Sequence, residues 1–301
     1  MNRLEQLPDS LMIFGCGYVG TALARHCMEQ GVRVSALTRN SEKAEVLKQM
    51  GVSEVVIGEL DSEAWHEQLT GSYQAVVNCV SSAGGGIDGY RKSYLNGQAS
   101  ILKWAGSQSI QRYVYTSSTS VYPQDGGVEV DEAADTASAP PTGKVIAESE
   151  ALIAQAEESL ERWYVLRLAG IYGPGRHYLL NMLREGATII PGAGDYTLNV
   201  IHLEDIVGAI CAALNSGAAP SGIYNIADDQ PASKAEMVDW LANQLEIEPP
   251  AFDPEAVSPR LARRGGRMPD RRILNTKARD LLGWSPKYRS FREGYQALFD
   301  A

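Results

Sequence analysis

Three glycines near the start of the chain have the spacing that a phosphate-binding turn requires. Gly15 permits a tight turn from strand to helix, Gly17 lets a pyrophosphate approach the backbone, and Gly20 lets the helix pack closely on the strand. Free N–H groups at the start of that helix would hold the anion. An apolar run at 11–14 precedes the turn, and a segment of helical composition follows it. The sequence therefore predicts a dinucleotide-binding turn with cofactor contacts at Gly15, Cys16, Gly17, Tyr18, Val19 and Gly20.

The residue after the second predicted strand indicates which nicotinamide cofactor this turn would take. About twenty residues after such a turn, NAD-binding proteins usually present Asp or Glu to the ribose hydroxyls. This chain has Thr38-Arg39-Asn40-Ser41 there. A carboxylate would repel a 2′-phosphate, whereas a guanidinium pairs with it, so Arg39 favours NADP over NAD. The alternative is that Arg39 is an ordinary solvated loop residue, and NAD then stays open.

The composition is that of an ordinary globular protein and excludes several partners. The 301 residues can bury one large core or two modest ones. A formal net charge of −10 argues against a nucleic-acid partner, because phosphate binding needs a broad basic face. No apolar run approaches the roughly 18 residues of a membrane span, so no membrane partner is expected. The four cysteines are scattered, which predicts a cytoplasmic protein without disulfides or a metal site.

Strand and helix patterns alternate through the first half of the chain. Further buried strands are expected at 32–38, 54–57, 74–80, 112–116 and 163–168. Helices are expected at 41–50, with Ser41 as the N-cap, and at 90–107. This alternation, with right-handed crossovers, predicts an α/β fold built on a doubly wound parallel Rossmann sheet. Ligands of such sheets bind beyond the carboxyl ends of the strands, where the glycine turn lies.

The second half is less regular, which predicts a smaller C-terminal substrate lobe. Gly173-Pro174-Gly175 interrupts the chain, and 249–269 is rich in loop residues. A helix near 203–215 and a strand near 223–226 are expected to return to the sheet. The predicted division is therefore a dinucleotide-binding Rossmann domain of residues 1–170, completed by 197–226. The substrate-binding lobe comprises 171–196 and 227–301.

Several segments of the chain carry a family resemblance. The serine-rich strand end at 116–122 holds Ser118, and landmarks at 166–175, 199–205, 224–227 and 275–286 follow in order. These motifs resemble the extended short-chain dehydrogenase/reductase superfamily, in its NAD-dependent epimerase/dehydratase family. The likeness covers nearly the whole chain.

This resemblance implies a substrate class and several site positions. Most members act on nucleotide sugars, so a small-molecule substrate is expected, and a homodimer built on the helices at 90–107 and 142–158 is usual. Ser118 would occupy the position of the catalytic serine. Glu59 would meet the adenine end of the cofactor, or else be an ordinary loop carboxylate. We expect further cofactor contacts at the neighbouring strand ends, at Leu60, Asn78 and Val80.

Two departures mark an atypical member of that superfamily. Its members normally show G-x-x-G-x-x-G, and the shorter spacing of this chain still suits a phosphate. Their Tyr-x-x-x-Lys pair falls where this chain has Thr142 in the tyrosine position and Ile146 in the lysine position. A phenol beside an ammonium can relay a proton, whereas an aliphatic hydroxyl is far too weak an acid. Lys144 lies two residues from Thr142 and should face another side of the helix.

Replacement groups must come from elsewhere in the cleft, and the catalytic candidates are Ser118, Thr142 and His177. Ser118 is the best-placed hydroxyl, although a strand-end hydrogen bond is an equal alternative. Thr142 can donate a hydrogen bond. Histidine as a residue type is suited to proton transfer near neutral pH, which makes His177 the most attractive substitute, and its alternative is a surface or packing role. Six late arginines suit an anionic substrate or form a solubilising or intersubunit patch: Arg260, Arg263, Arg264, Arg267, Arg271 and Arg272.

These features together predict an NAD(P)-binding, epimerase/dehydratase-like oxidoreductase without the usual Tyr–Lys pair. Its substrate would be an anionic small molecule such as a nucleotide sugar. The alternative, favoured by Thr142 and Ile146, is a catalytically silent NADP-binding sensor or regulatory protein. Binding of another nucleotide without redox chemistry is a third interpretation, which Ser118 disfavours.

Overall fold

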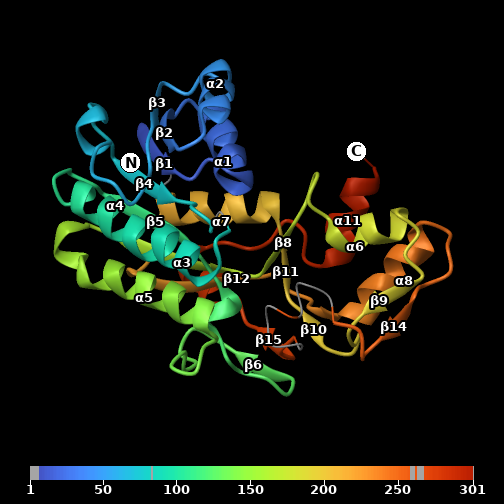
Figure 1. Ribbon diagram of the computed structural model, residues 1–301. Coiled ribbons are helices and arrows are strands. Elements are labelled where there is room, and N and C mark those ends of the chain that lie inside the picture. Colours follow the sequence, from blue (N-terminus) through green and yellow to red (C-terminus); the bar gives the residue numbers. More distant parts are fainter. Residues whose placement is uncertain (1–6, 83, 258–261, 263–267, 301) are drawn as a thin grey trace.

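The computed structural model describes residues 7–82, 84–257, 262 and 268–300 (Figure 1). Its centre is a sheet of seven parallel strands in the order β12-β7-β5-β4-β1-β2-β3. Every residue of the two central strands β1 and β4 is buried, as expected for strands covered on both faces. The seven strands are β1 (Ser10–Phe14), β2 (Arg33–Thr38), β3 (Glu54–Ile57), β4 (Ala75–Asn78), β5 (Arg112–Ser118), β7 (Trp163–Leu168) and β12 (Gly222–Ile226).

The strand order reverses beside β1. This strand pairs in parallel with β2 on one side and with β4 on the other. The chain runs from β1 outward to β3 and resumes at β4 on the opposite side, which opens a crevice at the carboxyl ends of β1 and β4. The predicted doubly wound parallel Rossmann sheet is confirmed.

Helices cover both faces of this sheet (Figure 1). α1 (Tyr18–Glu29), α2 (Ser41–Gln49) and α7 (Leu203–Asn215) share one face, where Leu11 and Ile13 of β1 pack with them. Met12 and Phe14 belong to a second core cluster, which α4 (Gly97–Ala105) and α5 (Pro141–Gln155) help to build. The period of two along β1 therefore sends alternate side chains into two core clusters.

A smaller lobe has a core of its own. Leu180, Ile190, Val238 and Phe291 are among the buried side chains of this third cluster. Outside the central sheet, the strands pair in twos. Apart from the helical segments between β4 and α4, the elements not yet named are β6 (Val128–Val130), β8 (Gly170–Tyr172), α6 (Tyr178–Arg184), β9 (Ile189–Pro191), β10 (Thr197–Leu198), β11 (Val200–His202), β13 (Ala232–Ser233), α8 (Lys234–Gln244), β14 (Ala251–Asp253), β15 (Arg271–Ile273), α10 (Thr276–Leu282) and α11 (Phe291–Phe299), with short 3-10 turns η1 (His66–Gln68), η3 (Thr119–Val121) and η4 (Glu157–Ser159).

The division into two domains stays a proposal, and the third cluster supports it. The members of that cluster fall within 172–200 and 232–295. One helix of the segment 227–301, which was expected to belong to the lobe, packs elsewhere. Ala278 and Leu282 of α10 lie in the core of the sheet domain, against β12 and α7. The segment 227–301 therefore returns to the sheet domain once before the chain ends.

Two helical details differ from the expectation. α2 begins at Ser41, but its N-cap is Asn40, whose Oδ1 accepts a hydrogen bond from the Lys43 N–H at 2.8 Å. The single helix expected at 90–107 is instead α3 (Gly86–Tyr90), a π-helical segment η2 (Arg91–Asn96) and α4. Over so short a stretch, apolar spacing does not distinguish a π-helical turn from an α-helical one. The sequence could therefore place the helix but not its hydrogen-bond pattern.

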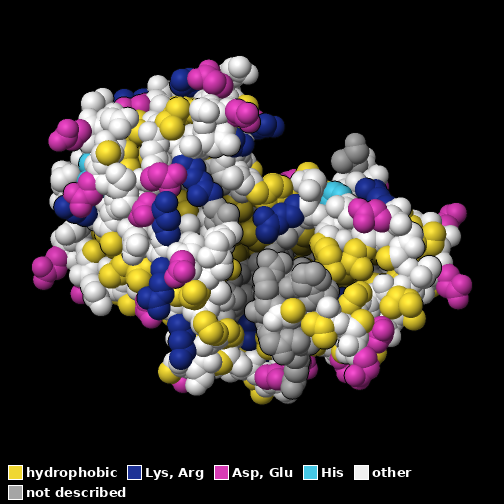
Figure 2. Space-filling view, viewed as in Figure 1, with side chains coloured by type: hydrophobic (Ala, Val, Ile, Leu, Met, Phe, Trp, Pro, Cys, Tyr) yellow, Lys and Arg dark blue, Asp and Glu magenta, His cyan; other side chains and the backbone are white. Residues whose placement is uncertain are grey.

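The structure shows the state of the cysteines and the distribution of charged side chains on one face of the surface. All four cysteines are free thiols, and burial raises the pKa of Cys16 and of Cys79 to about 12. Within the described residues, no cluster of His, Cys, Asp and Glu is arranged to hold a metal ion, and no helix has the length and apolar character to cross a membrane. On the face shown in Figure 2, Lys and Arg side chains are interspersed with Asp and Glu.

A buried ion pair fixes the position of α5 on the sheet. The Arg167 guanidinium of β7 binds both oxygens of the Glu150 carboxylate of α5, with an Nη2–Oε2 distance of 2.6 Å. The two side chains are only 5% and 4% exposed. Ser117 of β5 donates a further hydrogen bond to Glu150, and the Arg167 guanidinium lies 4.8 Å from the centre of the Tyr122 ring. The pair thus ties α5 to two neighbouring strands.

Glu150→Gln should lower the free energy of unfolding by about 3–5 kcal/mol, because it leaves the buried Arg167 charge without a counter-ion. The control is Glu63→Gln, which breaks the Lys103–Glu63 pair (2.6 Å; 64% and 59% exposed). That exposed pair should contribute little to stability, because water screens the two charges. Urea unfolding measures both losses, and equal losses in the two variants would contradict the anchoring role of the buried pair.

Candidate functional site

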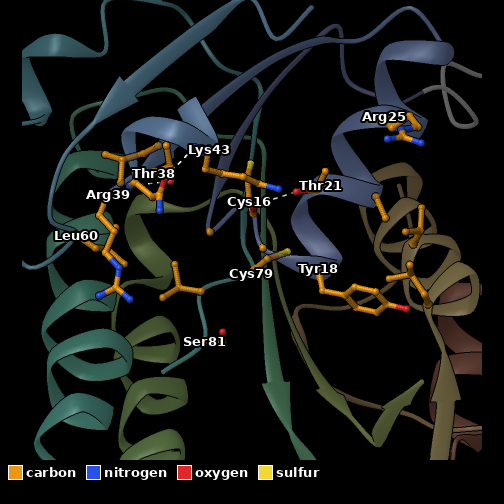
Figure 3. A pocket seen from close by; sticks show the side chains of 18 of the residues that line it. Cys16, Tyr18, Thr21, Arg25, Thr38, Arg39, Lys43, Leu60, Cys79 and Ser81 are labelled. Atoms are coloured by element: carbon orange, nitrogen blue, oxygen red, sulfur yellow. Dashed lines mark hydrogen bonds between the residues drawn. The ribbon is translucent and has the colours of Figure 1, made fainter. Parts of the chain in front are cut away.

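A cleft of about 1380 Å³ lies at the carboxyl ends of β1 and β2, beside the start of α1 (Figure 3). Figure 3 shows Arg39 and Tyr18 on opposite sides of the turn that carries Cys16. The fold therefore gathers residues from several strand ends around one cavity. The predicted cofactor contacts that line it are Gly15, Cys16, Gly17, Tyr18, Arg39, Glu59, Leu60 and Val80.

The three glycines of the turn have different tasks. Gly15 has a φ of +85°, and a Cβ there would lie 2.6 Å from the Val80 nitrogen. A Cβ at Gly20 would lie 2.4 Å from the Gly15 carbonyl oxygen, so the fold itself needs both glycines. A Cβ at Gly17 would meet no atom of the described structure within 4 Å. The space above Gly17 belongs to the cleft and has room for a ligand.

The start of α1 is suited to an anion. Gly17 is its N-cap, and no side chain caps the first turn in the described structure. The leading N–H groups of the helix therefore face the cleft with the positive end of the helix dipole behind them. These groups and the open space at Gly17 fit the diphosphate of a dinucleotide. Gly17 and the N–H groups that follow it would hold that diphosphate.

Three predicted cofactor contacts lie behind the cavity wall rather than in it. Val19 is buried in the core, and Gly20 faces the Gly15 carbonyl. Asn78 is also buried, where Nδ2 donates to Gln98 at 2.8 Å and Oδ1 accepts from the Val80 N–H at 3.0 Å. In this structure Asn78 acts as a support that positions Val80.

The end of the cleft beside β2 and β3 carries several charges. Arg39, at the end of β2, is exposed and lines the cavity together with Lys43 of α2. Glu59 and Asp61 follow β3 and line the same end, as does Lys92 of η2. Lys43 lies near enough to Cys16 to oppose the burial that raises the pKa of this thiol. Basic and acidic side chains are therefore gathered at this end of the cleft.

Ser118 ends β5 and lines a second, smaller cavity of about 100 Å³. Its hydroxyl oxygen accepts a hydrogen bond from the Ser120 N–H at 3.1 Å, which caps the η3 turn. The start of α5 packs directly on this turn, since a Cβ at Gly143 would lie 2.6 Å from the Ser120 carbonyl oxygen. Thr142 is therefore carried next to the serine-rich turn.

The other two catalytic candidates, Thr142 and His177, line neither of the two cavities. Thr142 is half-buried in the first turn of α5, and Lys144 is exposed. Ile146, in the position that the resemblance assigns to lysine, is 2% exposed and packs in the main core cluster. His177 precedes α6, with Nδ1 3.1 Å from the Gly173 carbonyl oxygen. Of the three candidates only Ser118 lines either of the two cavities described above.

Comparison with known proteins agrees with this geometry. A model of the NAD dependent epimerase/dehydratase family matches residues 11–227. The chain belongs to this family. The expected resemblance is confirmed, and with it membership in a group of NAD(P)-dependent oxidoreductases and epimerases.

Relatives cover most of the chain at modest identity. The chain is 28% identical to a 3-diazoavenalumate denitrifying reductase of Streptomyces sp, over 92% of this chain and 96% of that protein. It is 29% identical to protein YeeZ of Escherichia coli, over 80% and 85% of the two proteins. Among solved structures, a UDP-glucuronic acid 4-epimerase from Bacillus cereus in complex with UDP-glucuronic acid and NAD has a TM-score of 0.81, at 18% identity and with 97% and 98% of the chains covered. At that identity the likeness concerns the fold alone.

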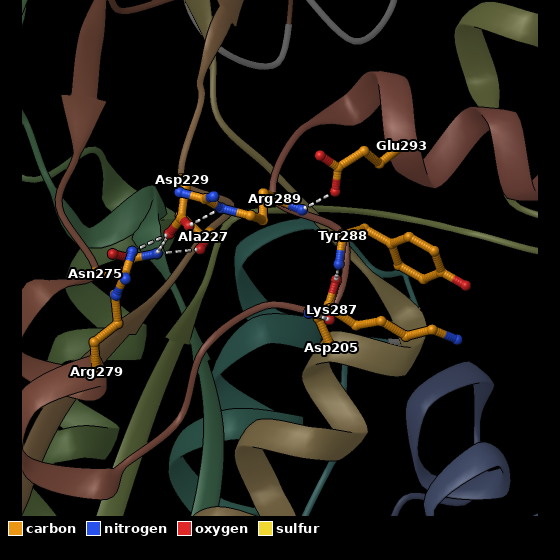
Figure 4. Close-up of polar contacts among 9 residues, drawn as sticks. All are labelled: Asp205, Ala227, Asp229, Asn275, Arg279, Lys287, Tyr288, Arg289 and Glu293. Atoms are coloured by element: carbon orange, nitrogen blue, oxygen red, sulfur yellow. Dashed lines mark hydrogen bonds and ion pairs between the residues drawn. The ribbon is translucent and has the colours of Figure 1, made fainter.

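In this family member the C-terminal segment ties the lobe to the sheet domain (Figure 4). The Asp229 carboxylate, only 8% exposed, binds Arg279 at 2.9 Å and Arg289 at 3.2 Å. Asn275 donates to the Ala227 carbonyl oxygen at 2.8 Å. The motif at 275–286 therefore has a structural task, because it fixes the chain that follows β12.

The late arginines divide into two groups. Arg260, Arg263, Arg264 and Arg267 lie outside the described residues. Arg271 is buried, and its guanidinium donates to the carbonyl oxygens of Thr119 at 3.0 Å and Gln124 at 3.1 Å. Arg272 is exposed on β15. Arg271 thus has a structural task, because it holds the chain beyond the Ser118 turn.

Two basic residues of the cleft were missed in the sequence. Lys43 lies on the first turn of α2, four residues after Arg39, and this closeness along the chain was a usable signal. Lys92 lies far along the chain, on a segment predicted only as part of a helix. No local pattern connects Lys92 with β2 and β3, and only the assembled sheet places it beside them.

Gly17→Ala should abolish dinucleotide binding while leaving stability almost unchanged, because its methyl group enters space that only a ligand would fill. Gly20→Ala should instead lower the free energy of unfolding by about 1–3 kcal/mol, because its Cβ meets the Gly15 carbonyl oxygen. Thermal unfolding and calorimetric titration with NADPH measure the two effects. Undiminished NADPH affinity in Gly17→Ala would contradict the placement of the diphosphate.

Proposed function

We propose that the protein is an NADP(H)-dependent oxidoreductase that acts on an anionic small molecule, with a nucleotide sugar as the leading substrate class. The observation that carries this proposal is a single cleft that joins the open space at Gly17 to the cations Arg39 and Lys43. The first feature suits a diphosphate, and the second suits the phosphorylated ribose of NADP.

The choice of NADP rests on charge rather than on relatives. The Bacillus cereus epimerase described above is in complex with NAD. In this chain Arg39 stands at the end of β2, where a carboxylate would be expected in an NAD-binding protein. Lys43, on the first turn of α2, adds a second cation that would reach the same phosphate. NAD is the alternative cofactor.

In the proposed chemistry the side chains orient the substrate and move a proton. A nicotinamide cofactor, when bound, supplies or accepts a hydride. Ser118 and Thr142 would orient the substrate oxygen through hydrogen bonds, because their aliphatic hydroxyls are too weakly acidic to replace a phenol beside an ammonium. His177 is the titratable candidate for moving the proton. This assignment accounts for a family member without the usual Tyr–Lys pair.

The proposed substrate class follows from the family and from the arginines. The Bacillus cereus structure holds UDP-glucuronic acid, an anionic nucleotide sugar. The Streptomyces relative is named as a reductase of another class of compound, so a non-sugar anion is a second substrate class. Arg272 on β15 is the exposed arginine of the described part of the late cluster and the candidate for a substrate anion.

A catalytically silent NADP-binding protein is the second candidate function. Ile146 favours it, because an apolar side chain in the core cannot lower the pKa of a proton donor as an ammonium does. Under either function we propose a cytoplasmic protein. A homodimer would use the helical stretch from α3 to α4 and helix α5.

Arg39→Gln should weaken NADPH binding about tenfold to hundredfold, because a charge-assisted hydrogen bond is worth about 1.5–3 kcal/mol. NADH binding should change little, since it lacks the 2′-phosphate. The control is Arg162→Gln, which removes an arginine just before β7, at the amino edge of the sheet. Calorimetric titration with both cofactors gives the ratio of affinities. Equal losses for the two, or tighter NADH binding by the unaltered protein, would overturn the NADP assignment.

A panel of UDP-sugars, ketones and aldehydes should include a substrate that changes the absorbance of the bound nicotinamide. Ser118→Ala should then lower the rate at least about tenfold, through loss of the hydrogen bond to the reacting oxygen. NADPH affinity of this variant should stay unaltered, because Ser118 does not line the larger cleft. Tight NADPH binding with no redox change across the panel would favour the silent alternative.

A further inference from the structure

Lys92 lies at the end of the cleft that holds Arg39, next to two carboxylates. We propose that Lys92 sets the preference for the phosphorylated cofactor by neutralising Glu59 and Asp61. This inference rests on the proposed NADP(H) function. It makes Lys92, on the π-helical segment η2, a specificity-determining residue of the cofactor site.

The geometry of the three side chains is that of a shared ion pair. Lys92 Nζ lies 3.1 Å from Glu59 Oε2 and 3.7 Å from Asp61 Oδ1. Lys92 and Glu59 are each 51% exposed and Asp61 is 26% exposed, so all three can respond to a ligand. All three line the cleft together with Arg39 and Lys43.

The turn that carries the carboxylates is held in place by packing. A Cβ at Gly97 would lie 2.6 Å from Leu60 Cδ2, so Leu60 lies against the start of α4, directly after η2. Trp65 Nε1 donates to the Leu60 carbonyl oxygen at 3.3 Å, and Ser100 Oγ donates to the Ser62 carbonyl oxygen at 3.1 Å. Glu59 and Asp61 therefore stay beside Lys92.

The charges decide which cofactor gains from Lys92. Arg39 and Lys43 carry two positive charges, and Glu59 and Asp61 carry two negative ones, so these four groups cancel. Lys92 leaves the end of the cleft with one net positive charge. A phosphate monoester carries about −1.5 to −2 charges near neutral pH, whereas the ribose hydroxyl of NAD carries none. Neutralised carboxylates therefore matter far more for NADP than for NAD.

The pKa of Lys92 reflects the charges around it. The hydrogen bond to Glu59 and the charge of Asp61 raise the pKa of Lys92, and Arg39 opposes this rise. Arg39 therefore lies within electrostatic range of Lys92. An exposed ion pair without influence on binding is the alternative, since most such pairs contribute little to stability.

Lys92→Gln should lower the ratio of NADPH to NADH affinity about three- to tenfold, because two carboxylates beside the 2′-phosphate then lose the cation that neutralises them. Lys103→Gln is the matched control. It breaks an exposed pair with Glu63, is located on α4, and should leave the ratio unchanged. Calorimetry with both cofactors at low salt gives the ratio, and thermal unfolding verifies that each variant folds. An unchanged ratio in Lys92→Gln would overturn the inference.

A double-mutant comparison distinguishes neutralisation from direct contact. In a Glu59→Gln, Asp61→Asn background, Lys92→Gln should change the ratio less than about twofold, since no carboxylate is left to neutralise. A full effect of Lys92→Gln in that background would mean that Lys92 acts on the phosphate itself, and would overturn the proposed coupling. If the unaltered protein bound neither cofactor, the proposed function would fail first. If the unaltered protein preferred NADPH and Lys92→Gln left that preference unchanged, only this inference would be overturned.

Discussion

The start of α1 can lie directly over the end of β1 only because Gly15 and Gly20 have no side chains. A Cβ on Gly20 would lie 2.4 Å from the Gly15 carbonyl oxygen, and one on Gly15 would meet the backbone at Val80. This close packing brings the leading N–H groups of α1 to the floor of the crevice between β1 and β4. The remaining parts of the cofactor site are arranged around that floor.

The opposite side of the site depends on a different constraint. The buried pair of Arg167 and Glu150 holds α5 against β5 and β7. Gly143 then allows the start of α5 to touch the turn that follows Ser118. Because these contacts do not involve Thr142 or Ile146, the framework around the serine is built whether or not those positions carry a phenol and an ammonium.

Most of the fold could be predicted from local sequence, and part of the site could not. The apolar run of β7 and the amphipathic pattern of α7 predicted both elements with the bounds that the structure shows. The glycine turn could also be predicted, because its geometry depends only on neighbouring residues of the chain. Lys92 and the support role of Asn78 were not, because their partners come from distant segments. The Asn40 cap was local but was assigned one residue too late.

The two ends of the site depend on single side chains to different degrees. The proposed diphosphate end consists of backbone N–H groups and the open space at Gly17, and the proposed adenosine end has several cations. Proton transfer, in contrast, needs one group with a suitable pKa at one place. Ile146 packs in the core as an apolar side chain, so its burial carries no desolvation penalty. It supplies no charge that could lower the pKa of a proton donor. In the proposed site, cofactor affinity and turnover therefore depend on different groups, and the first implies nothing about the second.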